Sequence, residues 1–192
     1  QSVARRMTAE QVIRKYRLWH ENHTFVDNEA DLVEAAVLVP LVLHDEPTLL
    51  LNERADHLRD HAGQVCLPGG RIQPDDDSLL QTALRETHEE NGISPEAVNV
   101  IGPMKACPTF TGFNITPFLC TLASPLALEL DPEEVKSAFE MPLSYLLSPD
   151  VIRLESQMWE GKKYSYYVIE YEGYRIWGAT ASILVNLVEI AR

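Results

Sequence analysis

Basic residues are scarce in this sequence. Lysine and arginine together number 16, against 29 aspartate and glutamate residues, so the formal net charge at pH 7 is −13. A broad nucleic-acid-binding surface needs a patch of basic side chains, and this balance argues against one. It leaves room for a small anionic ligand, because a few arginines or one bound cation can reverse the local field.

Long apolar runs are also missing. No stretch approaches the roughly 20 consecutive apolar residues of a membrane-spanning helix, and no segment has the apolar centre of a signal peptide. The chain ends in Glu-Ile-Ala-Arg, which is not a peroxisomal address of the Ser-Lys-Leu type. We therefore expect a cytoplasmic protein without a membrane partner.

Cysteine is rare as well. Cys66, Cys107 and Cys120 are odd in number and widely spaced, and no two of them form a C-x-x-C pair. This spacing argues against a disulfide framework and against a cysteine zinc site. Reduced cysteines buried in a core are typical of cytoplasmic proteins.

What the sequence does contain is the patterning of one mixed α/β domain. Its 192 residues and 45% hydrophobic content suit one domain with a sizeable core. We predict a single domain over residues 1–192, with a helical N-terminal extension over 1–33 and the core over 34–192. The patterns predict a helix from Thr8, a strand hairpin over 34–43 and 48–53, a helix over about 77–91, strands over 98–106 and 115–123, a helix starting in 131–141, a late strand or hairpin over 164–178, and a closing helix over 179–191.

Two of these predictions depend on proline. Pro40 lies inside the first apolar strand, and proline there indicates an irregularity or an edge position in the sheet. Asp131 followed by Pro132 has the pattern of a helix N-cap and first helical position.

Residues 67–93 place two adjacent glycines, three successive aspartates and a glutamate-rich helix in one stretch. At about 100° per residue, Glu90 lies about 40° to one side of Glu86 and Glu89 about 60° to the other. No basic residue lies on this acidic stripe, so the carboxylates repel one another, and the helix dipole disfavours anions near the C-terminus. A solvated acidic face is one interpretation. A divalent cation accounts for the repulsion better, because Mg²⁺ and Mn²⁺ prefer carboxylate oxygens.

Three neighbouring residues extend this hypothesis. Gly69 and Gly70 permit positive φ or close approach to a ligand, although an ordinary turn would also use them. Arg85 can brace the preceding loop through a carboxylate pair, or it can be a surface arginine.

At this point the residues resemble a Nudix box, which is a glycine, a spaced acidic residue, then Arg-Glu-apolar-x-Glu-Glu-x-Gly-apolar. The matching positions are Arg85, Glu86, Glu89, Glu90, Gly92 and Ile93. Thr87 replaces the usual apolar residue, and the spacing from Gly70 to Arg85 is one residue longer than the general pattern. Asp76 and Asp77 both lie near the place of the spaced acid.

A second segment resembles the coenzyme A pyrophosphatase branch of the Nudix hydrolases. That segment reads roughly LLTxR-S/A-x3-R-x3-G-x3-FPGG, and residues 50–70 read LLNERADHLRDHAGQVCLPGG. The matches are Arg54, Ala55, Arg59, Gly63, Pro68, Gly69 and Gly70. Asn52 stands in place of Thr and Leu67 in place of Phe. Later segments, TGFNITPF, FEMPL and WGATA, also resemble this branch.

The resemblance implies a Nudix-type α/β/α sandwich with a mixed sheet. It implies hydrolysis, dependent on Mg²⁺ or Mn²⁺, of the pyrophosphate bond of coenzyme A and its thioesters. The products would be 3′,5′-ADP and 4′-phosphopantetheine or its acyl derivative. Family members often dimerise, so a homodimer is open as well.

The resemblance also suggests roles for single residues. Glu86, Glu89 and Glu90 are the expected metal ligands, and Arg85 is expected beside them at the catalytic centre. Glu89 is the first candidate for general base and Glu134 the second, since other Nudix enzymes take this residue from a late loop. A first-turn helix glutamate is the alternative for Glu134.

The substrate is expected to contact Arg54, Arg59, Gly69 and Gly70. Arginine suits phosphate because its planar fork binds two oxygens at once, although a surface salt bridge is the alternative for both arginines. Two other functions are open: hydrolysis of another nucleoside diphosphate derivative, such as ADP-ribose, NADH or a dinucleoside polyphosphate, and a non-enzymatic domain that senses a nucleotide. The sensing domain normally has a broken box, whereas this box keeps every glutamate.

Overall fold

The structure, a computed structural model, describes residues 6–28 and 31–192. Its helices are α1 (Ala9–Asn22), α2 (Leu79–Asn91), α3 (Leu143–Leu146) and α4 (Gly178–Ala191), with a 3₁₀ turn η1 (Pro95–Ala97). Its strands are β1 (Val33–Leu43), β2 (Thr48–Arg54), β3 (Val65–Cys66), β4 (Gly69–Arg71), β5 (Val98–Pro103), β6 (Cys107–Pro108), β7 (Phe113–Ala123), β8 (Val135–Pro142), β9 (Ile152–Trp159), β10 (Lys162–Tyr171) and β11 (Tyr174–Trp177).

The main sheet is mixed, and β1 runs through its centre. The strand order is β3-β2-β1-β7-β5 among the described residues, with β4, β6 and β8 paired beside this path. β1 is parallel to β7 but antiparallel to β2 and β4. The predicted hairpin of the first two strands is therefore confirmed.

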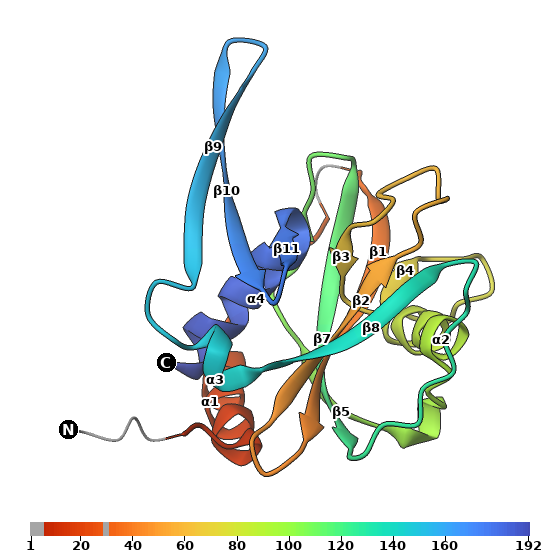
Figure 1. The fold of residues 1–192 in the computed structure, drawn as a ribbon. Helices are drawn as coiled ribbons and strands as arrows, with labels where there is room; N and C mark the ends of the chain where they lie inside the picture. Colours follow the sequence, from red (N-terminus) through yellow and green to blue (C-terminus); the bar gives the residue numbers. More distant parts are fainter. Residues whose placement is uncertain (1–5, 29–30) are drawn as a thin grey trace.

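Helices cover both faces of this sheet, as Figure 1 shows. On one face, α2 packs its apolar side on β1 and β7, around Ala83, Leu38 and Phe118. On the other face, α1 and α4 share a larger core with the sheet. The prediction of a mixed α/β fold with a mixed sheet is confirmed, and the layers match the expected sandwich.

Pro40 does not mark a sheet edge, so that part of the prediction was wrong. It pairs in register with Cys120 on the parallel strand β7. On the other side of β1, the β4 pairing ends at Val37 and the β2 pairing begins at Leu41. Pro40 lies in the gap between these two ladders, where its missing N–H removes no strand-to-strand hydrogen bond. The irregularity is this break between the two antiparallel partners.

The segment 131–141 forms a turn followed by strand β8 rather than the predicted helix. Asp131 does start a turn, because its Oδ1 accepts the Glu133 N–H (3.0 Å) and its backbone oxygen accepts the Val135 N–H (2.8 Å). The chain then becomes extended as β8, which pairs antiparallel with β2 over Thr48–Arg54. Pairing with a central strand outweighed the local capping signal.

A smaller sheet of β9, β10 and β11 adjoins α4. It confirms the late hairpin predicted over 164–178, although β9 lay outside that prediction. In Figure 1 the β9–β10 hairpin, in the lighter blues, extends well beyond the body of the protein. Among the described residues, none of the helices is long and apolar enough to cross a membrane.

Candidate functional site

Helix α2 sets the position of the site. Ser78 caps its start by accepting the Gln81 N–H, and Gly92 ends it in the left-handed conformation at φ 72°, which glycine adopts without strain. Buried Ala83 and Thr87 hold the helix against the sheet. This packing directs Glu86 and Glu90 toward β4.

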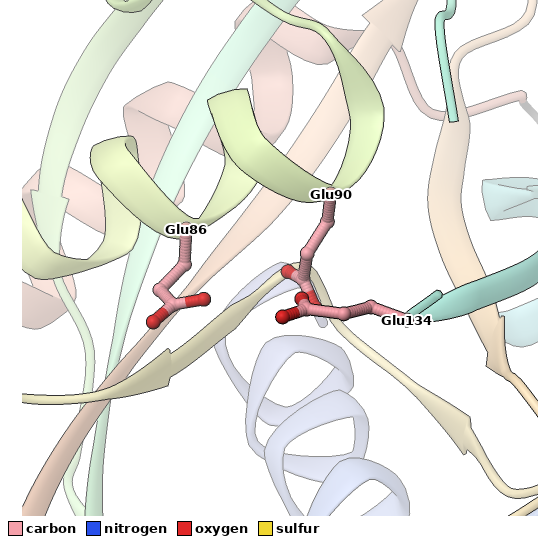
Figure 2. Close-up of side chains that lie close together, drawn as sticks. All are labelled: Glu86, Glu90 and Glu134. Atoms are coloured by element: carbon pink, nitrogen blue, oxygen red, sulfur yellow. The ribbon is translucent and has the colours of Figure 1, made fainter. Parts of the chain in front are cut away.

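Three carboxylates come together there. Glu86, Glu90 and Glu134 each offer an oxygen atom, and these atoms all lie within 4.8 Å of one another. Figure 2 shows Glu86 and Glu90 projecting from α2 and Glu134 reaching them from the segment before β8. The site therefore joins residues that lie more than forty positions apart in the sequence.

Glu90 is the most buried member of this acidic cluster, with only 3% of its surface exposed. Its Oε1 accepts the Gly69 N–H at 2.9 Å. The pKa of Glu90 is raised to about 8, chiefly by burial; the charges of Glu86 and Glu134 add to this rise, and the Gly69 hydrogen bond opposes it. Burial also raises the pKa of Glu86. Without a cation, the cluster therefore holds protons that an ordinary carboxylate would release.

Glu89 lies outside this cluster, although the sequence placed it there. Its side chain is 52% exposed. Glu86 and Glu90 are one turn apart and face β4. The Glu89 side chain points toward solvent instead. The interpretation that no basic residue serves the stripe was wrong too: Arg85 Nη1 donates to Glu86 Oε1 at 3.0 Å and to Glu89 Oε1 at 3.3 Å.

Arg85 also braces the preceding loop. Its Nε and Nη2 donate to the two carboxylate oxygens of Asp76, at 2.8 and 2.9 Å. The Thr82 hydroxyl and the Gln73 N–H donate to the same carboxylate. These bonds hold the pKa of Asp76 well below its usual range. Of the two aspartates that could fill the acidic position before the helix, Asp76 makes this pair.

Steric limits explain why Gly69 and Gly70 are glycines. A Cβ on Gly69, whose φ is 156°, would lie 2.2 Å from the backbone oxygen of Ala36 on β1. A Cβ on Gly70 would lie 2.6 Å from the carboxyl carbon of Glu86. Both glycines thus let β4 pass between the central strand and the acidic cluster, and Gly69 presents its N–H to Glu90.

The two candidate arginines differ in position. Arg54 ends β2 at a register shift against β8, and such bulges redirect side chains. Its positive charge acts on Glu90, and its Nε is buried without a hydrogen-bond partner among the described residues. Arg59 is exposed in the loop between β2 and β3. The structure thus brings Arg54, but not Arg59, next to the cluster.

Three further residues near the cluster escaped the sequence analysis as site residues. Cys66 lies beside Arg54 and Glu90, and burial raises the pKa of its thiol to about 12. Asn52 and Asn91 are fully buried and bonded to each other. Asn52 carried a signal in the sequence, because it replaces Thr in the pattern that the segment 50–70 resembles.

Comparison with known proteins agrees with this architecture. The family model described as NUDIX domain matches residues 33–164. A protein of Yersinia pestis (strain Pestoides F), described as an uncharacterized Nudix hydrolase NudL, is 42% identical over 155 residues, which cover 81% of this chain and 78% of that protein. A NudL protein of Yersinia pseudotuberculosis serotype O:1b (strain IP 31758) matches equally well.

Solved structures show the same fold at lower identity. The MutT/nudix family protein from Enterococcus faecalis has a TM-score of 0.51 at 16% identity, covering 96% of this chain and 69% of that one. The Ap4A hydrolase of C. elegans, in a binary complex, has a TM-score of 0.50 at 22% identity, covering 59% of this chain and 82% of that one. With the family match and the NudL relatives, the Nudix residues on α2 and the mixed sheet lead to one conclusion: the chain belongs to the Nudix hydrolase family.

Proposed function

We propose that this Nudix hydrolase splits the pyrophosphate bond of coenzyme A and its thioesters, yielding 3′,5′-ADP and 4′-phosphopantetheine or its acyl derivative. The observation that carries the catalytic part is the acidic cluster of Glu86, Glu90 and Glu134 beside the Gly69–Gly70 segment. The coenzyme A part is supported by the resemblance of residues 50–70 to that branch.

The acidic cluster fits a hard divalent cation. Its donors are three carboxylates whose oxygens lie within 4.8 Å of one another, and the raised pKa of Glu90 reflects a burial that a cation would offset. Carboxylate oxygens are the ligands that Mg²⁺ and Mn²⁺ prefer. When bound, either ion supplies positive charge for the phosphates and lowers the pKa of a water molecule.

The chain's own residues would then share the work. Glu86 and Glu90 would hold the cation from α2, and Arg85 would keep Glu86 in place through its hydrogen bond. Glu134 would serve as a third ligand or accept the proton of the attacking water. Glu89, the first candidate for base from the sequence, becomes the second candidate for ligand or base, since it is exposed to solvent beside Arg85.

Substrate contacts are proposed for Arg54, Arg59, Gly69 and Gly70. Arg54 has the stronger support, because its guanidinium lies near Glu90 and its Nε has no hydrogen-bond partner in the part of the chain that the structure describes. The planar guanidinium can bind two oxygens of one phosphate group. Arg59, on the exposed loop, would contact the 3′-phosphate that distinguishes coenzyme A.

Hydrolysis of a different nucleoside diphosphate derivative is the second candidate, and the C. elegans relative described as an Ap4A hydrolase illustrates such a substrate. Initial rates with coenzyme A, dephospho-coenzyme A, ADP-ribose and NADH decide between them. We expect the highest kcat/KM for coenzyme A. A kcat/KM for ADP-ribose or NADH that exceeds the coenzyme A value by tenfold would overturn the substrate proposal. No hydrolysis of any of them, with nucleotide binding intact, would favour a sensing domain.

We also propose a cytoplasmic location and assembly as a homodimer. The location is supported by Cys66, Cys107 and Cys120, which are all free, as expected in a reducing compartment. The dimer is supported by apolar side chains exposed on the β9–β10 hairpin, among them Leu154, Met158 and Trp159.

A further inference from the structure

Two buried asparagines link the two halves of the candidate site. Asn52 Nδ2 donates to Asn91 Oδ1 at 2.9 Å, and Asn91 Nδ2 donates to Asn52 Oδ1 at 2.7 Å. Both residues are completely buried. The pair is therefore a reciprocal amide bridge between strand β2 and the last turn of α2.

Asn91 lies at the acidic end of this bridge. It follows Glu90 directly, and the backbone oxygens of Glu90 and Asn91 accept the N–H groups of Asp131 (3.0 Å) and Glu129 (2.9 Å). Those two bonds hold the segment that carries Glu134. Fixing the last turn of α2 thus also fixes the loop that supplies the third carboxylate.

Asn52 lies at the cationic end. It precedes Arg54 by two residues on β2, and it pairs in register with Cys66 on β3. Arg54 acts electrostatically on both Cys66 and Glu90. The bridge therefore connects the strand that presents the guanidinium with the helix that presents the carboxylates.

A buried amide pair does more than fill space. Leucines of similar branching would pack at these positions without any polar group to satisfy. Two opposed N–H···O bonds fix both the distance and the relative orientation of the elements that carry them. Apolar contacts are not directional and would allow α2 to shift along β2.

We propose that Asn52 and Asn91 are positioning residues that hold the acidic cluster in register with Arg54. This inference rests on the proposed function, in which the cluster binds a cation and Arg54 binds phosphate. It also gives a reason for the departure from Thr at position 52: the longer amide side chain can exchange two hydrogen bonds with Asn91, which a hydroxyl group cannot do in the same geometry.

The test compares Asn52→Leu, Asn91→Leu and the double variant. Each single variant leaves one buried amide without its partner, so we expect a lower Tm for both. The double variant removes both amides and should regain much of that loss. It should still lower kcat by about tenfold to a hundredfold, because misplaced catalytic groups cost that much. It should also weaken Mn²⁺ binding, measured by electron paramagnetic resonance, with a smaller change in KM.

Thr121→Val is the matched control, because it removes a part-buried hydrogen bond that Asn99 on β5 donates to Thr121 on β7, away from the cluster. We expect parental kcat and Mn²⁺ affinity from it. Asn91→Ser keeps a polar group and leaves room for water, so it serves if the leucine pair does not fold, and we expect a several-fold loss of kcat. A folded double variant, or Asn91→Ser, with parental kcat and Mn²⁺ affinity would overturn the positioning role.

The two proposals can fail separately. Activity is followed with whichever nucleoside diphosphate derivative the parent hydrolyses best, so a substrate other than coenzyme A changes the proposed function but not this test. The Mn²⁺ measurement needs no substrate at all. Parental Mn²⁺ binding that is lost in the double variant but kept in Thr121→Val supports the positioning role by itself.

Discussion

The buried carboxylate of Glu90 lowers the stability of the cation-free protein when it is ionised. It is a carboxylate with 3% of its surface exposed, and its pKa of about 8 means that it stays protonated at neutral pH without a compensating charge. Such a residue destabilises the fold whenever it ionises alone. Its position beside Glu86 and Glu134 makes sense if a cation supplies the missing charge.

Neutralising single glutamates distinguishes the cluster from the exposed glutamate. Glu90→Gln keeps an oxygen for the Gly69 N–H but removes the charge, so we expect most activity to be lost with the fold intact. Glu134→Gln should lower kcat by about 10²–10⁴-fold if it accepts the proton. Glu89→Gln should have the smallest effect of the three, because Glu89 lies outside the cluster. Steady-state kinetics at saturating substrate and metal, with circular dichroism as a folding check, measures this.

The opposite ranking would reassign the base. Near-parental kcat in Glu134→Gln together with a large loss in Glu89→Gln would make Glu89 the proton acceptor. Full activity of Glu90→Gln at saturating metal would remove it from the metal site.

At the scale of elements, the ion pair of Arg85 with Asp76 ties α2 to its preceding loop. Arg85 holds the pKa of Asp76 below the ordinary value of 3.8, and the Asp76 side chain is only 2% exposed. The folded-state pKa is lowered, so the stabilisation is present above the ordinary pKa and is lost as the pH falls through the folded value.

Asp76→Asn should therefore lower stability in a pH-dependent way. At pH 7 we expect a loss of about 2 kcal/mol, typical of a hydrogen bond to a charged group, or a Tm lower by roughly 4–8 °C. The gap to the parent should narrow as the pH is lowered below about 4. Thermal melts of both proteins at pH 7 and pH 3 measure this. An equal gap at both values would mean that the charge of Asp76 contributes nothing.

For the whole molecule, metal binding should appear as thermal stability. Glu90 has a raised folded-state pKa, so on its account the cation-free fold loses stability as the pH rises from about 5 to about 8. A cation favours the ionised form and must displace the proton. Added Mg²⁺ or Mn²⁺ should thus raise Tm, and more at pH 8 than at pH 6; at 100 times Kd the gain is about 2.7 kcal/mol.

A melting series with each metal, with chelator, and with Glu90→Gln as the control checks this. No Tm increase in the parent, or an equal increase in Glu90→Gln, would leave the metal site without support. Activity that survives a chelator would do the same.

Assembly is the second property of the whole molecule. β9 is an edge strand among the described residues, and open edges pair readily with other strands. Residues 152–177 contain four basic and four acidic residues, so this part is neutral in a chain of net charge −13. Two acidic copies would therefore repel least here. An antiparallel pairing of two β9 strands centred on Ser156 would place Leu154 of one copy opposite Met158 of the other, with no like charges opposed.

This arrangement predicts a dimer that charges on β9 disrupt. Leu154 and Met158 are each 64% exposed, so replacing both by Lys should not affect the core. We expect a dimer of the parent and a monomer of the double variant in sedimentation equilibrium at micromolar concentration. Leu18→Lys, a change at a similarly exposed position on α1, should remain dimeric. A monomeric parent, or a dimeric double variant, would refute the β9 contact.

The sequence by itself determined three of the helices and the residues of the candidate site that lie on α2. Capping and periodicity located α1, α2 and α4, because such signals act within one or two turns of chain. Thr8 and Gln11 form a capping box at the start of α1, and Gly92 ends α2. The Nudix pattern marked Glu86, Glu90 and Arg85 for the same reason, since their spacing within one helix is fixed by its pitch. The single-domain boundaries and the residue roles stay predictions.

Only the tertiary structure decided which residues from distant parts of the sequence come into contact. Glu134 joins the cluster because the turn over residues 131–134 leads into β8 (Val135–Pro142), which pairs with β2 instead of forming a helix. Glu89 lies outside the cluster because the packing of α2 on β1 and β7 turns its side chain toward solvent. The Asn52–Asn91 bridge spans 39 residues of sequence, and neither asparagine has a pattern that names the other. Contacts at such separation depend on the competition among all possible pairings of the folded chain, which no short stretch of sequence contains.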